Sequence, residues 1–263
     1  FNTGTLSSTS TAGTGIQLSN ADGAVNFNGT VTLTGGDNGV DIISGSSGAV
    51  DFDAATITNP SGEALRIFNG SGGDQAANVT FDGVISTNAG RPVLIEDVSG
   101  GTVAVNASIN ATGQGLLVQN NTGGTFTFSN ATQTLNTAAN AAVSLLNNTG
   151  ATVNFSGGSM VISTAAGAGF NASGGGTVNV IGAANTVASG TGTAVTIANT
   201  SIGGSGVTFR TISASGAANS RPSSRNSGGA RPPRAAPWPC EYGRRRAVQS
   251  PYQGPPRPDP GRS

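Results

Sequence analysis

Three aspartates in the first third of the chain have the types and spacing that glycoside chemistry requires. Asp51 and Asp53 alternate with apolar residues in the stretch Val-Asp-Phe-Asp-Ala-Ala, and Asp82 follows a phenylalanine as Asp53 does. In an extended strand, residues i and i+2 lie on one face about 7 Å apart. Two carboxyl groups about 5–9.5 Å apart can cleave a glycosidic bond, one as an acid and one as a base or nucleophile. An enzymatic interpretation would therefore assign catalysis to Asp51, Asp53 and Asp82.

A structural role for these aspartates fits the sequence better. Four polar residues follow an apolar-x-apolar triplet and precede Gly or Ala, namely Asn28, Asp53, Asp82 and Asn106. Asp and Asn serve the same backbone function in a short turn. The chain has no histidine and no lysine, so few groups could accept a proton, and neither a histidine-based nucleophile pair nor a zinc-ligand set can be assembled. We therefore expect turn residues and no catalysis.

A calcium site is the other chemistry that the acidic residues suggest. The stretch Gly-Gly-Asp-Asn-Gly-Val-Asp-Ile-Ile at 35–43 is similar to the glycine-rich calcium-binding nonapeptide, with Asp41 in the place of its aspartate. The calcium candidates of the chain are thus Asp41, Asp53 and Asp82. However, Asp37 replaces the second glycine of that pattern and no tandem copy follows. We therefore expect no metal and no cofactor.

Charge is distributed unevenly along the 263 residues, although the formal net charge is zero. Residues 1–217 contain ten carboxylates and three arginines, which gives −7, and residues 218–263 contain nine arginines and two carboxylates, which gives +7. Frequent Val, Ile and Thr distinguish the first part from a disordered chain. The sequence predicts an ordered part over 1–217 and a disordered, Arg/Pro-rich tail over 218–263.

The tail has three interpretations. It could be a basic arm that touches nucleic acid, acidic polymer or anionic lipid, a linker, or an out-of-frame translation, which the abrupt change of composition favours. We therefore do not expect a nucleic-acid partner. The only cysteine, Cys240, lies in the tail, and no apolar run reaches the length of a membrane span. The chain begins at Phe1 without a signal-peptide pattern, as expected for a piece of a longer protein.

An apolar-x-apolar triplet recurs along the first 217 residues, at steps of 25, 29, 24, 23, 27, 25 and 29 residues. It begins at Val25, Val50, Val79, Val103, Phe126, Val153, Val178 and Val207. A second triplet precedes most of these by about ten residues and begins at Ile16, Val40, Leu65, Val93, Leu116, Val143 and Val195, with a less regular version around Phe170. A third apolar position follows at Val31, Ile57, Ile85, Ile109, Leu135, Val161, Val187 and Ile212. The alternation of period two indicates strands.

Strands this short cannot bury a core alone, so the repeated units must stack on one another. We predict an all-β fold, a right-handed parallel β-helix of about eight coils with three short strands in each coil. Eight coils at about 4.8 Å between neighbouring strands give a length of about 38 Å. The tetrapeptide Asn-Asn-Thr-Gly, which occurs at 120–123 and 147–150, is then the same corner of two adjacent coils, because Asn and Gly tolerate left-handed backbone angles.

The repeat also predicts charge pairing between neighbouring strands. Alignment of the coils on Val40, Leu65 and Val93 places Asp41 beside Arg66, and Glu63 beside Arg91, on the outside. Opposite charges on adjacent strands attract, and exposed pairs contribute about 0–1 kcal/mol each.

Two stretches, LLVQNNTGGTFTFSN at 116–130 and GTAVTIANTSIGGSGVTFRTISASGAAN at 192–219, resemble the parallel β-helix repeats of large bacterial surface and secreted proteins. Autotransporter passengers and filamentous-haemagglutinin-like adhesins are the types concerned, and the resemblance covers roughly residues 10–216. It implies an extracellular or cell-surface location in bacteria, and partners such as a host or cell-surface glycan or protein and the neighbouring coils of a longer chain.

Pectate lyases and polygalacturonases share this type of fold, so a carbohydrate-active enzyme using Asp51, Asp53 and Asp82 is the alternative. An enzyme should show a groove with aromatic side chains for sugar binding. Here most aromatics are phenylalanines at predicted inward positions, and the single tryptophan, Trp238, lies in the tail. We therefore interpret the chain as an extracellular structural or adhesive stalk without catalysis.

Overall fold

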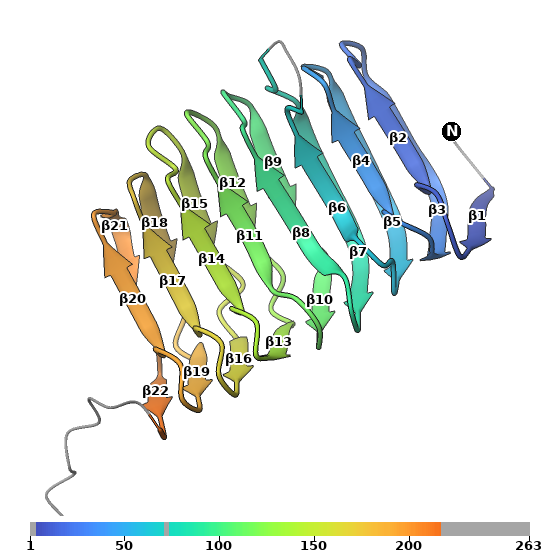
Figure 1. The fold of residues 1–263 in the computed structure, drawn as a ribbon. Helices are drawn as coiled ribbons and strands as arrows, with labels where there is room; N and C mark the ends of the chain where they lie inside the picture. The colour runs from blue at the N-terminus through green and yellow to red at the C-terminus, as the bar shows by residue number, and fades with distance from the viewer. Residues whose placement is uncertain (1–3, 71–73, 217–263) are drawn as a thin grey trace, which may run out of the picture. The chain divides into compact units, whose positions relative to one another are not determined.

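The computed structural model describes residues 4–70 and 74–216, and these residues form a parallel β-solenoid (Figure 1). All pairings between its strands are parallel, and the described residues contain no helix. No helix in this part of the chain could therefore cross a membrane. The tail that the sequence predicts over 218–263 lies outside the described residues. The predicted all-β class and parallel β-helix of about eight coils are confirmed.

One eight-stranded sheet collects the first strand of every coil. In spatial order it consists of β2 (Ile16–Ser19), β4 (Val40–Ile43), β6 (Glu63–Phe68), β8 (Arg91–Glu96), β11 (Leu116–Gln119), β14 (Val143–Leu146), β17 (Phe170–Ser173) and β20 (Val195–Ala198). Each strand pairs with the strand that lies one coil further along the chain, and these strands lie in front in Figure 1, where the coils wind in the right-handed sense.

The remaining strands form a 14-stranded sheet that covers the other two sides of each coil. It starts with β1 (Thr5–Ser10), β3 (Val25–Gly35), β5 (Ala49–Thr58) and β7 (Asn78–Thr87). Beyond β7 one branch consists of β9 (Thr102–Val105), β12 (Thr125–Phe128), β15 (Thr152–Phe155), β18 (Thr177–Val180) and β21 (Ser201–Val207). The other branch consists of β10 (Ser108–Ala111), β13 (Gln133–Ala138), β16 (Met160–Thr164), β19 (Thr186–Ser189) and β22 (Thr211–Ala214).

The prediction of three short strands per coil holds only from β9 onward. In the first three full coils the second and third strands are joined in the long strands β3, β5 and β7, each of which contains a shift of register. A β-bulge bends a strand and increases its twist, so one continuous strand can turn from one side of the solenoid to the next without a loop.

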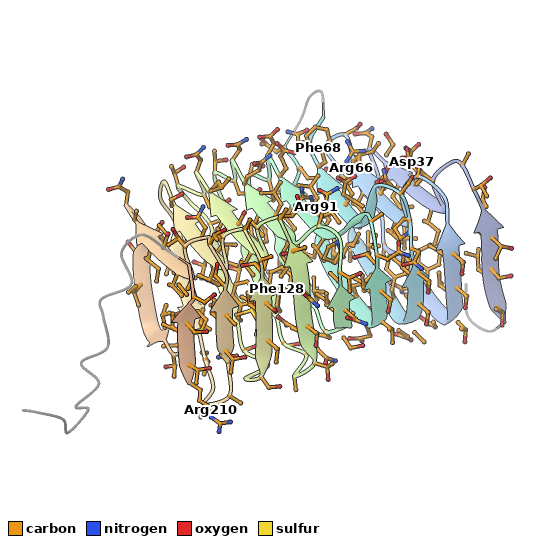
Figure 2. The ribbon with its side chains drawn as sticks, turned by 60° about the horizontal axis from the view of Figure 1, so that its bottom comes forward. Asp37, Arg66, Phe68, Arg91, Phe128 and Arg210 are labelled. Atoms are coloured by element: carbon orange, nitrogen blue, oxygen red, sulfur yellow. The ribbon has the colours of Figure 1, made fainter. Side chains whose placement is uncertain are left out.

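The core is a set of apolar ladders that run from coil to coil. Within the predicted inward set, Val50, Phe52, Val79, Phe81, Phe126, Phe128, Val153 and Phe155 are at most 2 % exposed. Val25 and Phe27, which belong to the first full coil, are half-buried. The rings of Phe27 and Phe52 stack at 4.5 Å, and those of Phe128 (labelled in Figure 2) and Phe155 at 5.0 Å. Burial of these side chains drives the stacking, because one coil alone has no interior.

Two apolar positions of the repeat differ from the prediction in register: Val161 faces outward, and Val207 packs against the core one place further along. Val161 is 44 % exposed, because Ile162 pairs with Leu135 and takes the inward position. The register of β21 shifts so that Val207 pairs with Val180 and Ile202 takes the place opposite Val178. An apolar-x-apolar pattern cannot distinguish neighbouring frames where three apolar residues occur close together.

The two Asn-Asn-Thr-Gly segments form the same corner in adjacent coils, as predicted. Asn120 and Asn147, the first residues of the motif, have φ angles of 57° and 56°. The second asparagines are buried, and Asn121 Nδ2 donates a hydrogen bond to Asn148 Oδ1 at 2.7 Å. The Asn121 side chain also accepts a hydrogen bond from the backbone N–H of Val98 at 2.8 Å. The motif therefore supplies both the turn geometry and a buried hydrogen-bond ladder between coils.

Candidate functional site

The three aspartates of the enzymatic interpretation lie on the outer surface of the 14-stranded sheet. Asp51 is half-buried on β5, and Asp53 and Asp82 directly follow the paired residues Phe52 and Phe81 of adjacent coils. Burial raises the pKa of Asp51, and the charges of Asp53 and Asp82 raise it further. The structure therefore brings the three carboxylates close enough to interact.

The sequence predicts a turn after each of these apolar triplets, but in the early coils the structure has a continuous strand with a register shift at this point. The residues concerned are Asn28, Asp53 and Asp82, which lie inside β3, β5 and β7, where the register shifts. Gly83 has a φ of 138°, and a Cβ atom there would collide with the carbonyl of Ala55. A glycine is therefore needed after Asp82 for the two strands to approach closely. Only Asn106 lies between two strands, β9 and β10, as the turn prediction requires.

The calcium candidates do not form one group. Asp41 lies on β4 of the eight-stranded sheet, whereas Asp53 and Asp82 belong to the 14-stranded sheet. Within residues 4–70 and 74–216, no three His, Cys, Asp or Glu side chains are placed so that they could hold a metal ion together. Calcium prefers six to eight oxygen ligands, and the described side chains do not assemble an acidic cluster that approaches this number.

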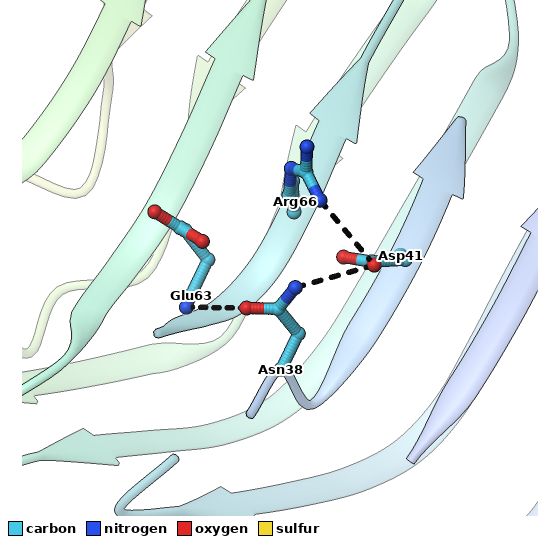
Figure 3. Close-up of polar contacts among 4 residues, drawn as sticks. All are labelled: Asn38, Asp41, Glu63 and Arg66. Atoms are coloured by element: carbon cyan, nitrogen blue, oxygen red, sulfur yellow. Dashed lines mark hydrogen bonds and ion pairs between the residues drawn. The ribbon is translucent and has the colours of Figure 1, made fainter. Parts of the chain in front are cut away.

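A second polar cluster, centred on Asp41 and Arg66, lies on the outer side of the eight-stranded sheet (Figure 3). The two residues are direct partners on β4 and β6, as the repeat predicts, and Arg66 NH1 lies 3.5 Å from Asp41 Oδ2. The expectation of an exposed pair is wrong, because the Asp41 side chain is 2 % exposed and that of Arg66 is 26 % exposed. The pair is therefore less screened by water than a surface ion pair.

Asn38 connects this ion pair to the next coil. Its Nδ2 donates a hydrogen bond to Asp41 Oδ2 at 3.2 Å, and its Oδ1 accepts one from the backbone N–H of Glu63 at 2.8 Å (Figure 3). Burial disfavours the charged carboxylate of Asp41 and raises its pKa, and the contacts with Asn38 and Arg66 offset part of this cost.

The second predicted pair, Glu63 and Arg91, is confirmed in register but not as an ion pair. The two residues are partners on β6 and β8. The Arg91 guanidinium instead donates hydrogen bonds to the carbonyl of Gly115 at 3.0 Å and to Gln114 Oε1 at 2.7 Å. Burial lowers the pKa of Arg91, and the charge of Glu63 opposes this effect. Arg91 therefore fixes the loop that precedes β11.

A pocket of about 240 Å³ adjoins Arg91 on the same side of the solenoid. Its polar lining includes Gln114, Gln119 and Ser144, and its apolar lining includes Leu117 and Leu146. The volume is below the range of about 300–1,000 Å³ that is typical of small-molecule sites. Gln119 also donates a hydrogen bond from Nε2 to Glu96 Oε1 at 2.5 Å. The arrangement can accept one small polar group but does not enclose a substrate.

The sequence predicts that Asp41 pairs with Arg66 but not that the two residues belong to a buried polar cluster. The one sequence feature that could indicate this cluster is Asn38, three residues before Asp41. Its hydrogen bond to the backbone of the next coil depends on how the chain turns before β4, which the sequence does not show.

Comparisons with known proteins add no assignment to this geometry. No protein-family model, no curated protein and no solved structure matches the chain.

Proposed function

We propose that the chain is a non-catalytic, extracellular β-solenoid stalk and serves as a spacer or adhesive part of a bacterial surface protein. The observation that carries this proposal is the unbroken pairing of strands from coil to coil in both sheets. In such a stack each coil contacts its neighbours, so length can be added without a new fold. The resemblance of residues 10–216 to surface adhesin repeats supports the adhesive role and the bacterial location.

The composition supports the extracellular location. Residues 1–217 contain no cysteine, and charged residues are only 9 % of the whole chain. A cysteine-free chain of this kind can be exported in an extended form and can fold afterwards without disulfide formation. The partner would be a glycan or a protein on a host or neighbouring cell.

A mechanical measurement tests the stalk. The full chain, held at its two ends in a force spectrometer, should unfold in steps that correspond to one coil or several coils. A coil of about 25 residues releases roughly 85 Å of extended chain. A single step that releases all coils at low force would contradict a load-bearing role. Labelling of intact cells with an antibody against residues 4–216 tests the location, and detection only after lysis would contradict an extracellular position.

A carbohydrate-active enzyme is the second candidate, and one observation favours it. Burial and, after it, the charges of Asp53 and Asp82 raise the pKa of Asp51, and a carboxyl group with a raised pKa can act as a general acid. Incubation of the full chain with polygalacturonate, with detection of reducing ends and of unsaturated products, distinguishes the two candidates. The stalk proposal predicts neither product.

A further inference from the structure

The side of the solenoid formed by the third strand of each coil carries no charged side chain. It consists of β1, the second halves of β3, β5 and β7, and the strands β10, β13, β16, β19 and β22. These strands form the lower edge of Figure 1 and come forward in Figure 2. We call the outward-facing residues of these strands the threonine face.

The threonine face is ordered in ranks that run from coil to coil. One rank consists of strand partners in direct register, Thr9, Thr34, Thr58, Ser86, Asn110, Thr134, Val161, Thr186 and Thr211. A second rank lies two residues earlier in the first five strands and consists of Ser7, Thr32, Thr56, Val84 and Ser108. Six of the nine positions in the first rank are threonine, so the pattern is a feature of the face and not of one coil.

The two ranks form a rectangular grid. Neighbouring members of one rank are about 4.8 Å apart, and the two ranks are about 6.6 Å apart along each strand. Parallel pairing without a register change within a rank keeps this spacing over successive coils. The shorter spacing is close to the repeat of oxygen atoms along the a axis of hexagonal ice.

The chemistry of the grid combines methyl and hydroxyl groups. Where threonine is replaced by valine, the branched methyl group remains at the surface, and Val84 and Val161 are 42 % and 44 % exposed. Among the described residues, no hydrogen bond joins the hydroxyl groups of Thr34, Thr58 and Thr134 to each other or to another side chain. These hydroxyls are therefore available to water, and the methyl groups between them restrict where that water can lie.

The other two outer sides differ from the threonine face. The first-strand side carries Asp41, Arg66 and their polar neighbours. The second-strand side carries the three aspartates in its early coils, and in its later coils Asn179 Nδ2 donates a hydrogen bond to Asn154 Oδ1 at 2.8 Å. Charged groups bind water too strongly for it to take lattice positions. Asparagine amides that hydrogen-bond to each other from coil to coil have fewer groups left to bind water.

We propose that the threonine face binds the surface of ice. The hydroxyl groups form hydrogen bonds with water molecules of the lattice, and the methyl groups fit between these molecules at the same repeat. A crystalline polysaccharide fits the face less well, because sugar rings stack on aromatic side chains and the face presents none at the positions of its two ranks. This binding goes beyond the stalk function and does not depend on it.

The test compares the full chain with two variants in an assay of ice recrystallisation and in measurements of thermal hysteresis. Thr58→Tyr places a bulky side chain within the first rank, between Thr34 and Ser86 and beside the second rank. Asn171→Tyr is the matched control, because Asn171 is a half-buried outward position on β17 between Ser144 and Thr196. Circular dichroism verifies that both variants retain the β-structure of the parent.

We expect the parent chain and Asn171→Tyr to inhibit recrystallisation, and Thr58→Tyr to lose this activity. Failure of the folded parent chain to inhibit recrystallisation would overturn the proposal, as would equal loss in both variants. The proposal would also be overturned if Thr58→Tyr left the inhibition of ice recrystallisation unchanged but abolished binding to microcrystalline cellulose or self-association in sedimentation velocity. In either case the face would have another occupant.

Discussion

The buried ion pair of Asp41 and Arg66 gives the sharpest prediction about stability. Replacement of Arg66 by Met removes the cation and keeps most of the apolar stem, so the buried carboxylate of Asp41 keeps only Asn38 and Gln17 to stabilise its charge. Loss of one partner from a fully buried pair costs about 3–5 kcal/mol. The separation of 3.5 Å and the 26 % exposure of Arg66 reduce this value, and we expect about 1–3 kcal/mol at pH 7.

The sign of the pH dependence follows from the raised pKa of Asp41. A carboxyl group whose pKa is higher in the folded than in the unfolded protein contributes stability when it is protonated, and this contribution is lost as the pH rises through the folded pKa. Removal of Arg66 raises this pKa further. The destabilisation by Arg66→Met should therefore be largest at pH 7 and should nearly disappear near pH 4, close to the unfolded pKa of about 3.9.

Urea denaturation of the parent, Arg66→Met, Asp41→Asn and the double variant at both pH values measures these effects. Asp41→Asn retains an acceptor for Asn38 and removes the buried charge, so we expect it to be neutral or stabilising and to restore Arg66→Met to nearly the stability of the parent. A loss in Arg66→Met that is the same at pH 4 and pH 7, or that Asp41→Asn does not relieve, would refute the electrostatic explanation.

Three further outcomes are expected. Asn121→Ala leaves the Val98 N–H without its acceptor in the interior and should lower the free energy of unfolding by about 2–4 kcal/mol, which urea denaturation would show; an unchanged midpoint would contradict a stabilising ladder. Phe128→Ala should cost about 3–5 kcal/mol by the same measurement, because its ring is fully buried, and a cost below that of a surface substitution would contradict its place in the core. The triple change of Asp51, Asp53 and Asp82 to Asn removes mutual repulsion and should leave the thermal midpoint at pH 7 unchanged or slightly higher; glycan cleavage by the parent that this variant loses would reverse the assignment of function.

The strand register of the eight-stranded sheet could be predicted from the sequence. Val40, Leu65 and Val93 were aligned by their triplets, and the structure pairs them directly. The pattern is informative there because a shift by one residue would turn Asp41 and Arg66 toward the core. The corner function of Asn120 and Asn147 was predictable for a different reason, because Asn tolerates a positive φ.

The environment of individual side chains could not be predicted in this way. Asp41 is on the outward side of its strand, yet Asn38 and Arg66 cover it, and such covering depends on the shape of a corner. The sequence predicts a turn at Asp82, but Gly83 lets β7 continue as one strand opposite the register shift of β5. Val161 shows the limit of a degenerate repeat, because Ile162 beside it satisfies the same pattern.

Distances between spin labels test the stacking of coils most directly. Thr34, Thr134 and Thr211 belong to the first rank of the threonine face. Along this rank, Thr134 lies four strands from Thr34, and Thr211 lies seven strands from it. With Cys240 replaced by serine and cysteine labels at pairs of these positions, double electron–electron resonance should give distances of about 19 Å for Thr34–Thr134 and about 34 Å for Thr34–Thr211. Distances that follow the number of coils in this linear way confirm the parallel solenoid. A Thr34–Thr211 distance equal to or shorter than the Thr34–Thr134 distance would contradict it.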